Sequence, residues 1–184
     1  MKGDHLKIKE LSIKGCLLIE YAPYMDERGT FVKTFNRDLF KGTSLENFST
    51  EEEFFTQSFK NVIRGLHFQI PPFSHNKIVS CSLGKVTDVL LDLRGSSSTY
   101  GSYCTVDLSS ELYQSLYIPV GVAHGFISRS DASIVCYKVD KKYSSEHDAG
   151  VAWDSFSFDW GTDTPILSAR DRAFPSVAKF KSPF

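Results

Sequence analysis

Short runs of apolar and β-branched residues recur about every ten residues along most of the chain, and they constrain its fold more than any other feature. Turn-forming residues separate them, for example at 26–29, 71–72 and 95–98. The predicted strands cover residues 17–21, 30–35, 61–69, 77–83, 85–94, 103–109, 115–120, 124–129 and 133–140. Because many short strands at this spacing are typical of a sandwich or a barrel, the sequence predicts an all-β fold.

Helical signals are few and short. Residues 37–41 can form one turn that ends at Gly42. Ser168 and Asp171 have the spacing of a capping box, which would open a helical turn near the C-terminus. No repeat or low-complexity linker divides the 184 residues. We therefore expect one domain over residues 1–184, with short peripheral helices.

The charge balance excludes several classes of protein. The chain has 21 Lys and Arg residues against 22 Asp and Glu residues, which gives a net charge of −1 and no basic field for nucleic acid. No apolar run approaches the roughly 20 residues that span a bilayer, and residues 1–10 lack the apolar core of a signal peptide. We expect a cytoplasmic protein that binds neither nucleic acid nor membrane.

The scattered Cys16, Cys81, Cys104 and Cys136 indicate reduced, buried thiols.

Two histidines lie in patterns that suggest chemistry. His67 belongs to R-G-L-H-F-Q at 64–69, where a strand would place His67 and Gln69 on one face. His124 follows a Pro-Val-Gly turn at 119–121. A lone histidine on a strand is more often a core residue than a functional one. A metal site needs three or four ligands, and H-x-Q offers only one imidazole, so we predict no metal site.

Two carboxylates and one phenol lie among apolar neighbours. Asp88 and Asp92 share a strand face with apolar side chains, and burying them requires a partner. Either Lys77 or Arg94 pairs with them to hold the sheet, or one carboxylate orients a basic residue in a cavity. Tyr137 is either a packed core residue or a proton donor. The sequence leaves both questions open.

The chain lacks the G-x-S-x-G, Walker and G-x-G-x-x-G patterns of hydrolases, kinases and dehydrogenases. Over roughly residues 15 to 175 it resembles the dTDP-4-dehydrorhamnose 3,5-epimerase family. The resemblance rests on ordered motifs: D-E-R-G-T-F at 26–31, R-G-L-H-F-Q at 64–69, K-I-V at 77–79, G-K-V-T-D-V at 84–89, I-P-V-G-V-A-H-G-F at 118–126 and L-S-A-R-D at 167–171.

The resemblance implies a fold, a reaction and an assembly. The fold is a cupin-type double-stranded β-helix, or jelly roll, usually in a homodimer that exchanges a strand. The substrate is a 4-keto-6-deoxy sugar linked to a nucleoside diphosphate, and the reaction inverts C3, C5 or both without any cofactor or metal. A positively charged Lys77 beside an enolate, and a near-neutral imidazole that removes a proton, agree with this chemistry.

The resemblance also assigns the residues of the site. It implies His67 as the general base, Asp171 as its carboxylate partner, Tyr137 as the general acid and Lys77 as the cation that stabilises the enolate. The capping role competes for Asp171, and we expect the family role. The implied substrate-binding residues are Arg64, Gln69, Asp88, His124 and Tyr143, together with Arg28 and Phe31 in a strand lent to the neighbouring subunit.

The chain departs from the family pattern around the substrate. Lys33 replaces a glutamate, Ser80 an arginine and His75 a glutamine, and residues 55–61 are shorter than the family's Q-x-N-x-S stretch. The sequence therefore leaves dTDP, CDP and GDP open as nucleotides, and hexose or heptose as the sugar. A 3,4-ketoisomerase of the same substrate class, and a metal-binding or sugar-binding cupin, are the alternative functions.

Overall fold

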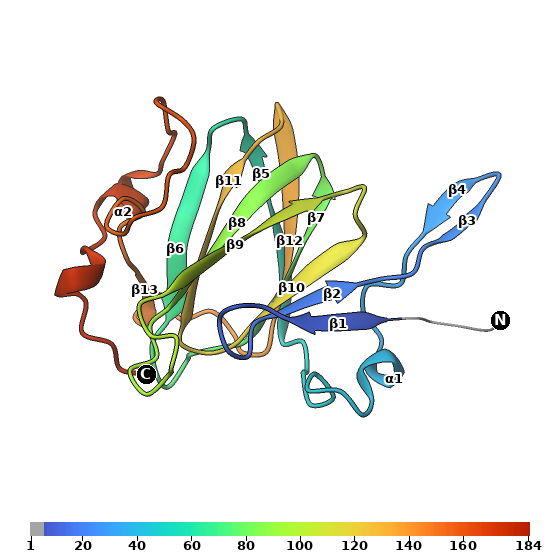
Figure 1. The fold of residues 1–184 in the computed structure, drawn as a ribbon, viewed down its shortest axis with the longest axis horizontal. Coiled ribbons are helices and arrows are strands. Elements are labelled where there is room, and N and C mark those ends of the chain that lie inside the picture. Colours follow the sequence, from blue (N-terminus) through green and yellow to red (C-terminus); the bar gives the residue numbers. More distant parts are fainter. Residues whose placement is uncertain (1–5) are drawn as a thin grey trace.

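A computed structural model describes residues 6–184, which fold into two facing antiparallel sheets and a separate hairpin (Figure 1). One sheet has the strand order β1 (Lys7–Glu10), β2 (Leu17–Glu20), β10 (Gln114–Ile118), β7 (Lys77–Leu83), β12 (Ala132–Val139), β5 (Glu52–Phe59). The other has the order β13 (Asp148–Gly150), β6 (Ile63–Gln69), β11 (Val122–Ser128), β8 (Lys85–Asp92), β9 (Tyr103–Ser109). This arrangement confirms the all-β jelly roll.

The five-strand sheet is covered on both faces. Alternate residues of β8, such as Val86 and Leu90, join the core between the sheets, whereas Val89 and Leu91 join a second core on the outer face. The C-terminal segment supplies Trp160 and other aromatic side chains to this outer core and lies over the sheet in Figure 1. Burial on both faces explains why every residue of β11 is buried.

Helices are as short as the sequence predicts. They are α1 (Arg37–Phe40), α2 (Ala169–Arg172) and the 3₁₀ turn η1 (Val177–Lys179). No helix of residues 6–184 is long and apolar enough to cross a membrane.

The strand predictions need correction: the short strands β1, β3 (Tyr24–Asp26) and β13 were not predicted, and two further differences concern longer segments. The predicted strand over 30–35 ends at Phe31, because this stretch is the second arm of the β3 and β4 (Gly29–Phe31) hairpin, and the following residues leave it towards α1. The sequence analysis also missed β5. Its acidic start and outward-facing aromatic residues conceal the alternation expected of a strand, but β5 pairs along its whole length with β12.

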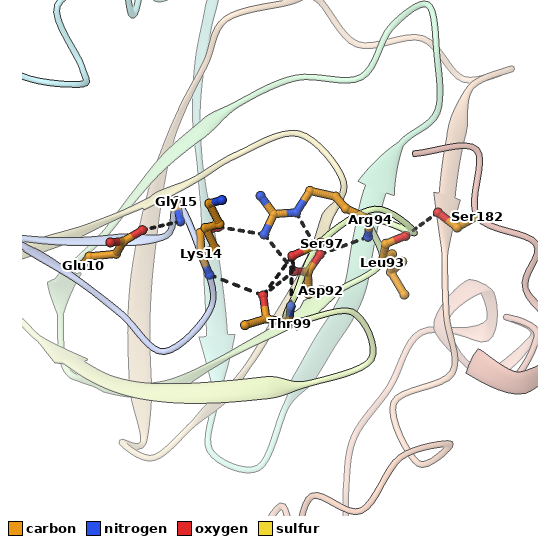
Figure 2. Close-up of polar contacts among 9 residues, drawn as sticks. All are labelled: Glu10, Lys14, Gly15, Asp92, Leu93, Arg94, Ser97, Thr99 and Ser182. Atoms are coloured by element: carbon orange, nitrogen blue, oxygen red, sulfur yellow. Dashed lines mark hydrogen bonds and ion pairs between the residues drawn. The ribbon is translucent and has the colours of Figure 1, made fainter.

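Asp92 organises one end of the sandwich (Figure 2). The carboxylate is fully buried and accepts hydrogen bonds from Arg94 Nε (2.8 Å), Arg94 Nη2 (2.8 Å), Ser97 Oγ (2.7 Å) and Thr99 Oγ1 (2.7 Å). Arg94 Nη2 also donates to the carbonyl of Lys14 (2.7 Å), which ties the N-terminal strands to the loop after β8. The structural interpretation of Asp92, with Arg94 as its partner, is confirmed.

The four cysteines carry free thiols. Cys16 and Cys81 are buried as expected, whereas Cys104 and Cys136 are only half-buried. Burial raises the pKa of Cys81 to about 11, so this thiol stays protonated at neutral pH.

Candidate active site

A cavity of about 290 Å³ lies between the two sheets and collects most of the residues that the sequence singled out. It is lined by Phe54, Thr56, Arg64, His67, Phe68, Gln69, His75, Lys77, His124, Phe126, Tyr137, Tyr143, Asp148 and Arg170. Both sheets contribute, because His67 and His124 come from β6 and β11, whereas Lys77 and Tyr137 come from β7 and β12.

His67 and Asp171 form a hydrogen-bonded pair. His67 Nε2 lies 2.9 Å from Asp171 Oδ1, and the other carboxylate oxygen accepts a hydrogen bond from the backbone N–H of Gly65 (3.1 Å). Burial opposes ionisation of Asp171, but the bonds to His67 and Gly65 outweigh it and lower the pKa of this carboxyl. The ionised carboxylate fixes the imidazole ring, as a general base requires.

The capping interaction and the pairing with His67 do not compete. Ser168 Oγ accepts a hydrogen bond from the backbone N–H of Asp171 (3.0 Å), which leaves the Asp171 carboxylate free to turn towards β6. The cap positions the first turn of α2, and α2 positions the carboxylate. Both predictions for Asp171 are therefore compatible in one geometry.

Two glycines allow the strands behind His67 to approach closely. A Cβ atom on Gly65 would lie 2.5 Å from the Cα atom of Gly125. The β6–β11 register shifts at this point, and His124 lies directly opposite His67. Gly65 has φ = +125°, a backbone conformation that favours glycine. The absence of side chains at Gly65 and Gly125 lets β6 and β11 pair closely. This pairing places His67 and His124 side by side at one end of the cavity.

Lys77 is a buried cation beside the histidine backbone. Its side chain donates from Nζ to the carbonyl oxygen of His67 (3.1 Å), and the residue is 8% exposed. Burial, opposed by Asp148 and assisted by Arg170, lowers the pKa of Lys77 to about 8. The ammonium is present at neutral pH and can meet a negatively charged oxygen inside the cavity.

Tyr137 approaches the cavity from the sheet opposite His67. Its ring stacks on Phe54, with 4.8 Å between the ring centroids and 14° between the planes, and its centroid is 6.0 Å from that of His124. Burial raises the pKa of the Tyr137 phenol, and the Asp88 carboxyl adds to this rise. The phenol is thus protonated at neutral pH and able to donate a proton.

Asp88 pairs with His124, a partner that the sequence analysis did not predict. The interpretation that Lys77 or Arg94 pairs with Asp88 is wrong, because His124 Nε2 contacts Asp88 Oδ1. Burial raises the pKa of Asp88 and lowers that of His124, which favours an uncharged pair that shares one proton. Asp88 itself lies behind the cavity wall and acts on it through His124.

The other predicted binding residues, Arg64, Tyr143 and Gln69, already form hydrogen bonds with neighbouring protein groups. The Arg64 guanidinium is held by Ser58 Oγ (3.0 Å) and the carbonyl of Gln57 (3.0 Å). Tyr143 is 59% exposed at the rim, and its hydroxyl donates to Asp148 Oδ2 (3.2 Å). The side chain of Gln69 lines the cavity, but its amide is occupied by contacts with neighbouring residues.

Arg28 and Phe31 are not brought to this cavity. They belong to the β3–β4 hairpin, which extends away from both sheets in Figure 1. Phe31 is 63% exposed, and Arg28 pairs with its neighbour Asp26 (2.6 Å). Their predicted binding role depends on a second subunit and stays a prediction.

The sequence analysis missed several cavity residues. Arg170 Nη2 pairs with Asp148 Oδ2 (2.6 Å) at the mouth, and Phe54 covers Tyr137. The position of Arg170 directly before Asp171 was the one available signal. Nothing in the local patterns around Asp148 and Phe54 distinguishes them from surface residues. Within residues 6–184, no group of three or more His, Cys, Asp or Glu side chains is arranged to hold a metal ion.

Known proteins are similar to this chain in sequence and in fold. The family model for dTDP-4-dehydrorhamnose 3,5-epimerase matches residues 10–179. The dTDP-4-dehydrorhamnose 3,5-epimerase of Methanothermobacter thermautotrophicus is 41% identical over 167 residues, covering 88% of this chain and 89% of the relative. That of Shigella flexneri is 35% identical and covers 90% and 93%.

A solved structure agrees with these matches. The dTDP-6-deoxy-D-glucose-3,5-epimerase of Legionella pneumophila, in complex with dTDP-4-keto-L-rhamnose, has a TM-score of 0.90 and 31% identity, and the match covers 96% of this chain and 95% of that one. The match extends over nearly the whole of both proteins. The chain therefore belongs to the dTDP-4-dehydrorhamnose 3,5-epimerase family.

Proposed function

We propose that this protein epimerises C3, C5 or both in a dTDP-linked 4-keto-6-deoxy sugar. The observation that carries the proposal is the position of His67 and Tyr137 on opposing sheets across one cavity, with Lys77 beside them. Inversion at carbon requires a proton to leave one face of the ring and another to arrive on the opposite face. A base and an acid on facing walls meet this requirement.

The proposed reaction needs only side chains of this chain. His67 accepts the proton from the carbon next to the C4 carbonyl, the C–H electron pair forms a C=C bond to C4, and the carbonyl π pair moves to the oxygen to give an enolate. The Lys77 ammonium stabilises this oxyanion, and Asp171 stabilises the imidazolium. Tyr137 then protonates the opposite face of the carbon. The phenolate regains a proton from water and the imidazolium returns its proton to water, which restores the enzyme.

The relatives support the nucleotide assignment. The Methanothermobacter and Shigella proteins are named for a dTDP-linked substrate, and the Legionella structure contains dTDP-4-keto-L-rhamnose. Arg64 and Arg170 at the cavity supply positive charge that suits a diphosphate. The 3,4-ketoisomerase and the metal-binding or sugar-binding cupin gain no support from these comparisons.

We also propose that the protein works as a homodimer. The β3–β4 hairpin carries exposed Tyr24, Met25 and Phe31 with Arg28 beside them, and such a surface fits a role in a neighbouring subunit's nucleotide pocket. The single domain and the cytoplasmic location expected from the sequence stay predictions.

Isotope exchange tests the proposed reaction. The protein is incubated in D₂O with dTDP-4-keto-6-deoxyglucose, and deuterium at C3 and C5 is followed by NMR. We expect incorporation at one or both carbons and a decrease of about 10² to 10⁴ in the exchange rate for His67→Ala. Ser82→Ala, a change on the exposed end of β7, is the control and should exchange normally.

The position of the label separates the alternatives. Deuterium at C3 alone would indicate a 3-epimerase. A product with its carbonyl at C3 would indicate a ketoisomerase. Absence of exchange with dTDP-, CDP- and GDP-linked substrates would overturn the proposed function.

A further inference from the structure

Gln69 holds its amide in one orientation. Its Oε1 atom accepts a hydrogen bond from the backbone N–H of Ser144 (2.6 Å), and its Nε2 atom faces the carbonyl oxygens of Phe73 (2.8 Å) and Lys142 (3.2 Å). An amide turned the other way would set oxygen against oxygen at two contacts. The amino group of Gln69 therefore points towards the loop that joins β6 to β7.

This orientation determines the state of His75, which lies on the same loop. His75 Nδ1 is 2.9 Å from Gln69 Nε2, a group that can only donate, so Nδ1 shares the two amide hydrogens with the two carbonyl oxygens and acts as an acceptor. A neutral imidazole that accepts at Nδ1 carries its proton on Nε2. The contact thus selects the Nε2–H tautomer.

The surroundings keep this ring uncharged. Burial and, to a smaller extent, the nearby Lys77 charge lower the pKa of His75 to about 3, although the Phe73 carbonyl opposes the shift. The next residue, Asn76, is fixed by two hydrogen bonds to the Asp140 carboxylate, so the loop end that presents His75 is well anchored. His75 is therefore a neutral donor over the whole physiological pH range.

The donor is available to a ligand. The His75 side chain lines the cavity that His67 and Lys77 also line, and the contact with Gln69 engages Nδ1 and leaves Nε2 for the cavity. It lies two residues before Lys77 in the chain. A neutral donor suits an uncharged sugar oxygen, whereas the diphosphate is better matched by the charged Arg64 and Arg170.

We propose that His75 is a substrate-binding residue that donates a hydrogen bond from Nε2 to an oxygen of the bound sugar. The inference rests on the proposed function, because it requires a sugar nucleotide in this cavity. Glutamine, which the family pattern has at this position, is also a neutral donor. Histidine in place of glutamine thus keeps an uncharged N–H donor at this position but changes the shape of the side chain that carries it.

NMR of the histidine ring nitrogens tests the proposal on the intact protein. The probes are dTDP-glucose, a sugar nucleotide without the reactive ketone, and dTDP, which lacks the sugar; calorimetry measures their binding in parallel. The His75 signals are assigned by their loss in His75→Gln. We expect the Nε2–H tautomer in the free protein, and a shift of the Nε2 resonance with dTDP-glucose but not with dTDP.

Three results would overturn the proposal. An Nδ1–H tautomer contradicts the hydrogen-bond argument. An unmoved Nε2 resonance while dTDP-glucose binds contradicts the sugar contact and leaves the proposed function intact. Binding of neither nucleotide contradicts the proposed function as well.

Kinetics give an independent measurement. His75→Gln should keep kcat/KM within about threefold, whereas His75→Leu, which lacks a donor, should lower it by about tenfold or more. His147→Gln is the matched control, because His147 packs against Phe73 on the same loop but does not line the cavity. Equal activity of the Gln and Leu variants, both folded by circular dichroism, would exclude a hydrogen bond from His75.

Discussion

His67 Nε2 and Asp171 Oδ1 are 2.9 Å apart although 104 residues separate them in the chain. Asp171→Asn should lower kcat on the order of 10²-fold, because a neutral amide stabilises the imidazolium poorly. Circular dichroism should show a folded protein, since the cap at Ser168 uses only the backbone N–H of residue 171. An Asn variant with unchanged kcat would show that Asp171 only shapes the loop.

Ser168→Ala is the matched structural change. Loss of the cap should cost about 1 kcal/mol of unfolding free energy, measured by urea denaturation. Because the Asp171 carboxylate keeps its bond to Gly65, activity should fall far less than in Asp171→Asn. A loss of activity as large as that of the Asn variant would mean that the cap, and not the charge, controls the base.

Tyr137→Phe should separate exchange from inversion. The base side of the cavity is intact in this variant, and a phenylalanine ring can keep the stack on Phe54. We expect deuterium exchange with retention to continue, while formation of the inverted sugar falls by about 10²-fold or more. NMR of the products in D₂O measures both quantities at once. Equal losses of exchange and inversion would contradict a role for the phenol as the second-face donor.

The activity should decline in alkaline solution because of Lys77. Burial lowers the pKa of this amine to about 8, so the ammonium that stabilises the enolate is lost as the pH rises through that value. We expect kcat/KM to fall above pH 8. In Lys77→Arg the decline should move beyond pH 9 even if the rate is lower, because a guanidinium does not titrate there. An identical profile in both proteins would assign the decline to another group.

Asp92 should govern stability at acid pH. The hydrogen bonds from Arg94, Ser97 and Thr99 outweigh burial and lower the pKa of Asp92, so its contribution is complete above about pH 4, the usual value for the unfolded chain, and is lost as the pH falls further. Asp92→Asn should cost about 3 kcal/mol at pH 7, since it leaves Arg94 without its counterion. Urea unfolding from pH 2 to pH 7 should show the difference between the two proteins shrinking as acid is added.

A mixing experiment tests the role of the hairpin. Arg28→Ala and His67→Ala should each be nearly inactive, but heterodimers of the two should regain activity if Arg28 serves the neighbouring subunit's cavity. One site of each heterodimer then contains both native residues. Failure to regain activity, with dimers demonstrated by light scattering, would exclude a shared site.

The sequence predicted the parts of the site that depend on strand periodicity. Alternation on one strand put His67 on the face opposite Leu66, and the structure places Leu66 in the outer core and His67 in the cavity. The Asp92–Arg94 pair was predictable because its members are only two positions apart in the sequence. Such inferences concern residues that are close in the sequence, because the alternation of a strand determines on which face each side chain lies.

Longer separations were not accessible from local patterns. Asp88 pairs with His124 because β8 and β11 are neighbours in a particular register, and that register is a property of the whole sheet. Phe54 reaches Tyr137 because β5 is the edge strand beside β12 and their register places the two residues opposite each other, and the sequence of β5 does not signal that position. Pairings of this kind are set by topology, which requires the complete fold.

The close approach of Gly65 and Gly125 limits how this enzyme could be re-engineered. Any enlargement at either position would separate β6 from β11 and disturb both imidazoles, although neither glycine lines the cavity. Libraries aimed at new sugars should leave the contact between these two glycines unchanged and diversify the entrance, where Tyr143 is solvent-accessible. Selectivity can evolve at the entrance while the rear wall keeps the reactive groups aligned.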